Sequence, residues 1–204
     1  MEWFSTFLVG LFFSYLGSIP PGMINISVLQ YSMQNKKGAA FSFNLAAILV
    51  EFVYAGIAVQ FQMFLTQNTS ITEYFQLLTA IVLIGLGVAN LLTQKSKTIE
   101  PPKKGEKRGA FKRGALISMA NPLAIPFWLA VTAYLQSMNW IYLEDSGFWW
   151  YISGISAGTF LLLATITLLA SKYSIVLNKP FLVYRVPGLV FLSMGGWALY
   201  QWIS

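Results

Sequence analysis

Six long apolar stretches dominate this chain and constrain its fold more than any other feature of the sequence. They run over residues 3–30, 39–65, 71–92, 111–135, 148–169 and 181–203. Each stretch is long enough to cross about 30 Å of hydrocarbon as a helix. Because backbone that faces lipid must satisfy its hydrogen bonds internally, we predict an all-α polytopic membrane protein with six transmembrane helices in a single membrane domain, residues 1–204.

The composition supports a membrane protein and excludes several kinds of chemistry. Charged residues make up 10% of the chain, whereas soluble domains carry about 25%. The first stretch lacks a basic n-region and a small-residue cleavage site, so we expect a mature helix and not a removable signal. The sequence contains no Cys and no His, which removes disulfides, thiolate metal sites and the commonest proton shuttle. We expect neither a cofactor nor a bound metal.

The charged residues predict the orientation of the helices. All 13 basic residues fall between helices 1 and 2, 3 and 4, or 5 and 6, at Lys36, Lys37, Lys95, Lys97, Lys103, Lys104, Lys107, Arg108, Lys112, Arg113, Lys172, Lys179 and Arg185. The opposite ends carry Glu2, Glu73, Glu144 and Asp145. Because cytoplasmic loops collect Lys and Arg, both termini are expected outside. The net charge of +6 then reflects topology and contact with membrane lipid, and we expect no nucleic-acid partner.

A basic linker over residues 94–110 divides the chain into residues 1–93 and residues 111–204. Each part contains three predicted helices, so the second part must enter the membrane from the face opposite to the first. If the two parts are alike, they form two inverted repeats. The sequence leaves open whether the protein is a homo-oligomer.

Both repeats contain a broken helix. Helix 1 is interrupted by Gly17-Ser18-Ile19-Pro20-Pro21-Gly22, and helix 4 by Asn121-Pro122. Proline removes a backbone N–H and clashes with the preceding turn, while Asn followed by Pro is typical of an N-cap and the first helical residue. Each break should start a half-helix whose N–H groups bind a small solute near the middle of the membrane. Alternatively, the prolines serve only to shape the helices.

The motifs at these breaks resemble the lysine exporter (LysE/RhtB) family of amino-acid efflux proteins. The likeness lies in residues 18–25, in Lys37-Gly38, and in residues 111–114 through 121–124. That family usually has Pro-Gly-Pro in helix 1 and Asn-Pro-Lys in helix 4, where this chain has Pro20-Pro21-Gly22 and Asn121-Pro122-Leu123. The resemblance implies proton-driven export of an amino acid or similar small zwitterion across the cytoplasmic membrane of a bacterium.

Glu51 lies near the centre of the second apolar stretch, and no Lys or Arg lies within the predicted membrane to pair with it. A central acidic residue costs about 2.5 to 3.5 kcal/mol on insertion and usually faces a cavity or an ion pathway. We therefore expect Glu51 to couple proton movement to transport, although it could instead be permanently protonated and structural. Asn44 and Tyr54 extend a polar stripe on the same helix. Asn25, after the first break, either contacts the solute or links helices.

Several other residues have structural interpretations. Gly85, Gly87, Gly195 and Gly196 should allow close helix approach. Trp3, Trp140, Trp149, Trp150 and Trp202 are typical of an interfacial belt.

The sequence lacks the catalytic residues of an intramembrane protease, since there is no His-Glu-x-x-His motif and only one aspartate. A hard divalent-cation exporter of the same superfamily, or a membrane assembly subunit without transport, remain the alternatives.

Overall fold

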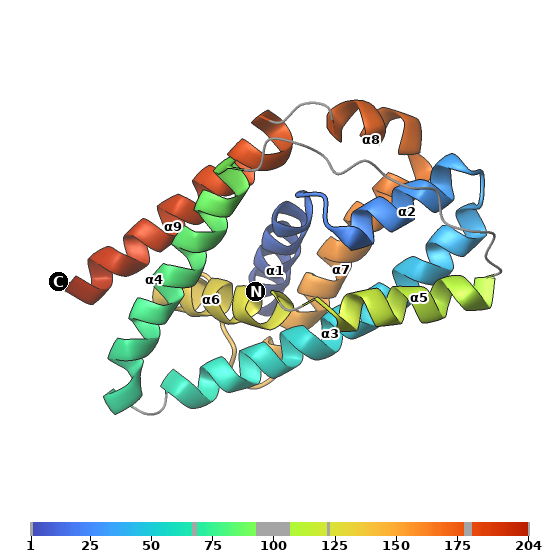
Figure 1. Ribbon diagram of the computed structural model, residues 1–204. Helices are drawn as coiled ribbons and strands as arrows, with labels where there is room; N and C mark the ends of the chain where they lie inside the picture. The colour runs from blue at the N-terminus through green and yellow to red at the C-terminus, as the bar shows by residue number, and fades with distance from the viewer. Residues whose placement is uncertain (1, 67–68, 93–106, 122, 178–180, 204) are drawn as a thin grey trace.

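The computed structural model describes residues 2–66, 69–92, 107–121, 123–177 and 181–203. Over these residues the regular structure is entirely helical, as Figure 1 shows, so the predicted all-α class is confirmed for this part of the chain. The elements are α1 (Glu2–Ser18), α2 (Met23–Met33), α3 (Lys37–Thr66), α4 (Thr69–Leu92), α5 (Lys107–Met119), α6 (Ala124–Ser137), α7 (Gly147–Leu168), α8 (Ala170–Leu177), the π-helix η1 (Phe181–Arg185) and α9 (Val186–Ile203).

Two helices of the described residues are long and apolar enough to span a membrane alone, α3 over Lys37–Leu65 and α7 over Gly147–Leu168. Two bent pairs pass the same test together. They are α1 with α2, bent by 78°, and Gly109–Met119 of α5 with α6, bent by 61°. The structure therefore supports between two and four spans and a polytopic membrane protein. The six-span topology and its orientation stay predictions.

The outer face of α3 shows why the protein belongs in a membrane. Large apolar side chains recur every three or four residues along it, and each is half exposed or more, at Leu45, Leu49, Val53, Ile57, Phe61 and Phe64. The opposite face of the helix is buried, with Ala47, Ala55 and Ala58 packed inside the bundle. A continuous exposed apolar stripe of this kind is avoided in water. In hydrocarbon it costs nothing, because lipid tails are as apolar as the side chains.

The helices pack in four main pairs: α1 against α7, α4 against α9, α3 against α5, and α3 against α7. In Figure 1, α1 lies in the middle of the view, α4 and α9 run side by side, and α5 lies along α3. The α1–α7 contact is unusually close, since a Cβ at Gly154 or Gly158 of α7 would overlap the carbonyl oxygen of Phe7 or Leu11. Small residues four apart permit this approach of two membrane helices.

Several predicted boundaries differ from the observed ones. Helix α5 begins at Lys107, within the predicted linker, because Lys, Arg and Ala are good helix formers that continue the helix beyond its apolar part. Residues 94–106 of that linker lie outside the described residues. The short α8 stands where a loop was expected, and the π-helix η1 forms the first residues of the predicted sixth helix, 181–203.

Of the four glycines expected at helix contacts, two lie at such a contact and two do not. Gly87 and Gly195 do lie in the α4–α9 contact. For Gly85 and Gly196 the prediction was wrong, because an added Cβ would meet no atom within 4 Å.

Candidate functional site

The first break separates α1 from α2, and the side chain of Asn25 holds it. The Asn25 amide nitrogen donates to the carbonyl oxygens of Ser18 at 2.6 Å and Pro20 at 3.3 Å. These carbonyls follow the last turn of α1, where no backbone donor within the helix is available. Asn25 therefore uses its donors to stabilise the break. Helix α2 starts after Gly22, which provides no side-chain cap for the first N–H groups.

The second break lies between Met119, the end of α5, and Ala124, the start of α6. The predicted N-cap was Asn121, but the N-cap residue is Leu123, so that prediction was wrong. The physical reason is a turn at Asn121, whose side-chain oxygen accepts the backbone N–H of Leu123 at 3.3 Å. Asn and Asp commonly bond the backbone two residues ahead in this way. Pro122, predicted to begin the half-helix, lies outside the described residues.

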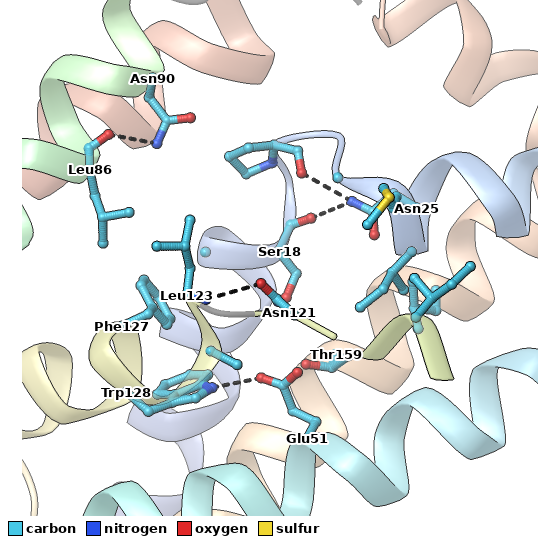
Figure 2. Close-up of a pocket in the computed structure, with 18 of the residues that line it drawn as sticks. Ser18, Asn25, Glu51, Leu86, Asn90, Asn121, Leu123, Phe127, Trp128 and Thr159 are labelled. Atoms are coloured by element: carbon cyan, nitrogen blue, oxygen red, sulfur yellow. Dashed lines mark hydrogen bonds between the residues drawn. The ribbon is translucent and has the colours of Figure 1, made fainter. Parts of the chain in front are cut away.

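The two breaks face one cavity of about 370 Å³, which is shown in Figure 2. Its polar lining side chains are those of Ser18, Asn25, Glu51, Asn90, Asn121 and Thr159. Its larger apolar lining side chains are those of Met23, Ile24, Leu86, Ile117, Leu123, Phe127, Trp128, Leu163 and Phe191. A volume near the lower end of the usual range for ligand sites, about 300 to 1,000 Å³, fits a solute of the size of a small metabolite.

Glu51 enters the cavity from α3 and is held by Trp128 of α6. The indole N–H of Trp128 donates to a Glu51 carboxyl oxygen at 2.6 Å. Trp128 is fully buried, whereas Glu51 is a partly exposed residue that lines the cavity. A neutral donor can bond this oxygen whether or not the other oxygen carries a proton. Trp128 therefore fixes the direction of the carboxyl group without fixing its charge.

Five of the predicted site residues line the cavity together: Pro20, Gly22, Asn25, Glu51 and Asn121. They come from α2, α3 and the two breaks, so residues separated by up to 101 positions meet at one place. Among the described residues that line the cavity, no second carboxyl group accompanies Glu51, and no His, Cys, Asp or Glu cluster suited to a metal ion is found. The polar part of the described lining therefore consists of amides, hydroxyls and a single carboxyl group.

Three predicted residues, Pro21, Asn44 and Tyr54, are absent from the described lining of the cavity. Asn44 lies two turns before Glu51 on α3 and donates to Thr167 of α7 at 3.0 Å. The hydroxyl of Tyr54 donates to the carbonyl oxygen of Met119 at 2.8 Å, where it closes the last turn of α5. The predicted polar stripe thus reaches the cavity only at Glu51. Asn44 and Tyr54 join helices instead.

Trp128, Phe127 and Thr159 are lining residues that were not among the predicted site residues. A signal for Trp128 was available, because it falls in the interior of an apolar stretch while tryptophans of membrane proteins usually gather at the interface. The five tryptophans assigned to that belt are in fact more than a third exposed. Thr159 is recognisable only in three dimensions, where its hydroxyl lies 2.8 Å from that of Ser14 on α1.

Apolar helices that enclose a solute-sized cavity between two broken helices define a class of protein, the multi-pass membrane transporters. The model of the LysE type translocator family matches residues 15–201. This chain therefore belongs to the LysE type translocators, which are transporters of small molecules and not enzymes.

A Bacillus subtilis (strain 168) protein called "Putative amino acid efflux protein YcgF" is 28% identical to this chain over 177 residues. The match covers 74% of this chain and 82% of that protein. No solved structure gives a significant match.

Proposed function

We propose that this protein is a proton-coupled exporter of an amino acid or similar small zwitterion in the cytoplasmic membrane of a bacterium. The observation that carries the proposal is Glu51, a partly exposed residue whose side chain lines a cavity between two helix breaks. No Lys or Arg is among the described residues that line the cavity. A carboxylate without a protein cation attracts either a proton or the ammonium group of a substrate.

Competition for one carboxyl group is enough to couple two fluxes. When Glu51 binds a proton, it loses its charge and its attraction for an ammonium group. When it binds the ammonium group, the proton must leave. The transporter with neither proton nor substrate bound carries an unpaired charge on Glu51, which is costly inside a membrane. If this form therefore seldom switches between its inward-open and outward-open states, substrate leaves the cell only in exchange for protons that enter.

The half-helix starts complement Glu51 by offering positive ends to a carboxylate. Neither N-cap residue, Gly22 before α2 or Leu123 before α6, caps its helix with a side-chain hydrogen bond. Backbone N–H groups at such ends attract anions. An amino acid could then place its ammonium group at Glu51 and its carboxylate at a half-helix start, which supports a zwitterion as the substrate.

Two further features support two inverted repeats of three helices, with six spans in all. Helix α1 of the first half packs on α7 of the second half, and correspondingly α5 of the second half packs on α3 of the first half. In addition, α2 and α6 both end in an Asn with a positive φ, 57° at Asn35 and 55° at Asn139. The following N–H groups bond back to Tyr31 and Leu135 respectively, at 2.9 and 3.0 Å, as in the Schellman motif.

The lining of the cavity extends toward the side that we predict to be cytoplasmic. It reaches Leu86 and Asn90, in the last turns of α4 before the basic linker. The other end of the bundle is filled by packed apolar side chains, among them Phe13, Ile141 and Leu143. This arrangement is what an exporter needs in the state that takes up solute from the cytoplasm.

Cysteine labelling tests the orientation directly, because the sequence contains no native cysteine. Lys37, at the start of α3, and Glu144, between α6 and α7, are both exposed. A membrane-impermeant maleimide added to intact cells should label the Glu144→Cys protein. The Lys37→Cys protein should be labelled only after the membrane is permeabilised. The reverse pattern would show that both termini lie inside.

The function itself is tested with purified protein in liposomes. An imposed pH gradient, acidic on the side of the predicted outer face, should drive radiolabelled amino acid toward the acidic side. Dissipating the gradient with a protonophore should stop accumulation above equilibrium. If no amino acid accumulates in a screen of neutral, acidic and basic members, the proposal is wrong.

Trp128→Phe tests the positioning of the carboxyl group. The change keeps an aromatic ring but removes the N–H that bonds Glu51. Hydrogen bonds to charged groups contribute about 1.5 to 3 kcal/mol, so we expect the transport rate at low substrate to fall at least about tenfold. Trp149→Phe is the matched control, because Trp149 is exposed and its ring contacts Phe148. Equal rates for both variants would contradict a positioning role for Trp128.

A further inference from the structure

One side of the cavity wall is mainly apolar. In Figure 2, Leu86, Leu123 and Phe127 lie on this side, with Asn90 next to Leu86, and Asn25 and Thr159 lie on the other side. Leu123 is 55% exposed, so an apolar side chain there faces the cavity space and is not packed away. Leu123 and Phe127 therefore offer an apolar surface to a bound solute.

Phe127 forms a rigid part of the apolar wall. Its ring meets the ring of Trp128 edge to face, with centroids 4.9 Å apart, and that of Phe191 in the same way at 5.5 Å. The ring also lies directly on Gly17 at the first break, where an added Cβ would come within 2.6 Å of the ring atom Cζ. Packed on three sides, Phe127 has little freedom to move away from a solute.

The charges of the cavity limit the side chain that a substrate can carry. Glu51 is the single charged residue among the described lining residues. Among the described lining residues an acidic side chain would find no Lys or Arg, and a basic one would need a second anion beyond Glu51. Burying either charge unpaired is costly. A hydroxyl or amide placed against Leu123 and Phe127 would lose hydrogen bonds to water, and the side chains of these two residues offer none in return.

We infer that the site selects neutral amino acids with an apolar side chain, of the size of leucine, methionine or phenylalanine, and that Phe127 is the specificity-determining residue. This inference rests on the proposed function, because it assumes that Glu51 and the half-helix starts receive the amino and carboxyl groups. The apolar side chain then lies against Phe127 and Leu123. Its burial contributes about 0.8 kcal/mol for each CH₂ group.

An exchange assay in liposomes tests the substrate class. Labelled leucine is taken up against internal unlabelled leucine, and external competitors are added in excess. We expect methionine and phenylalanine to compete within a fewfold of leucine, and threonine, lysine and glutamate to compete at least about tenfold more weakly, the factor that 1.4 kcal/mol produces. Exchange that favours lysine or glutamate contradicts this inference alone. Absence of exchange for every amino acid contradicts the proposed function as well.

Two variants test the role of Phe127 in opposite directions. Phe127→Ala removes the wall, so the preference for leucine over alanine should fall severalfold. In Gly17→Ala, the added methyl overlaps the Phe127 ring and must displace it, so the affinities for leucine and phenylalanine should change more than that for alanine. Gly56→Ala is the control, because its added Cβ meets no atom within 4 Å. If both variants that affect Phe127 keep the wild-type order of competitors, Phe127 does not determine specificity.

Discussion

Glu51→Gln should abolish accumulation driven by a pH gradient, and the gradient-dependent rate should fall at least about tenfold. The reason is that a neutral amide neither binds a proton nor attracts an ammonium group. Glutamine has nearly the same shape, and its carbonyl oxygen can still accept the 2.6 Å hydrogen bond from Trp128. The variant therefore removes the charge and keeps the packing. Truncating one member of a buried charge interaction typically costs 2 to 5 kcal/mol, which is more than a tenfold effect.

The control for this variant is the same substitution at Glu2, an exposed residue in the first turn of α1. Glu2→Gln should leave the flux unchanged, which separates the position of the carboxyl group from its general charge. The rate is measured in liposomes with and without the pH gradient, after the two variants are shown to elute as folded protein. Full gradient-driven transport by Glu51→Gln would rule out the proposed coupling.

The sequence predicts the site to the extent that the site depends on breaks in helices. Proline and glycine at 17–22 disrupt helix formation through their own covalent structure, so the break between α1 and α2 is found where it was predicted. The start of α6 is less predictable, because Asn121 has two ways to use its side chain. It can cap a helix or close a turn, and packing around the break selects the turn at Leu123.

Residues that depend on contacts between distant helices were harder to predict. Asn44, Glu51 and Tyr54 share a face of α3, but long side chains and different heights along the helix give them different partners, Thr167, Trp128 and Met119. The similar ends of α2 and α6 are a signal that was present in the sequence, at Asn35 and Asn139. The sequence alone does not predict this likeness, because an asparagine does not reveal by itself that its φ is positive.

The close contact between α1 and α7 should make the stability of the protein sensitive to substitution at Gly154. Gly154→Ala places a methyl group on the backbone carbonyl of Phe7, and backbone cannot turn aside as a side chain can. Overpacking of a tight core typically costs about 1 to 3 kcal/mol, so we expect a clear fall in the melting temperature of the purified protein in detergent. At Gly56, where an added Cβ is free of contacts, the same change should be neutral or stabilising, since Ala exceeds Gly in helix propensity by about 1 kcal/mol.

The comparison of the two alanine variants separates packing from propensity, because both gain the same propensity and only one gains an overlap. A Gly154→Ala protein as stable as Gly56→Ala would mean that α1 and α7 do not approach so closely.

The loosened contact between α1 and α7 in the Gly154→Ala protein should also affect the cavity. Helix α1 leads into the first break, and its Ser14 bonds Thr159 of α7, a lining residue. Gly154→Ala should therefore lower transport together with stability, although it lies outside the cavity lining, whereas Glu51→Gln should lower transport alone.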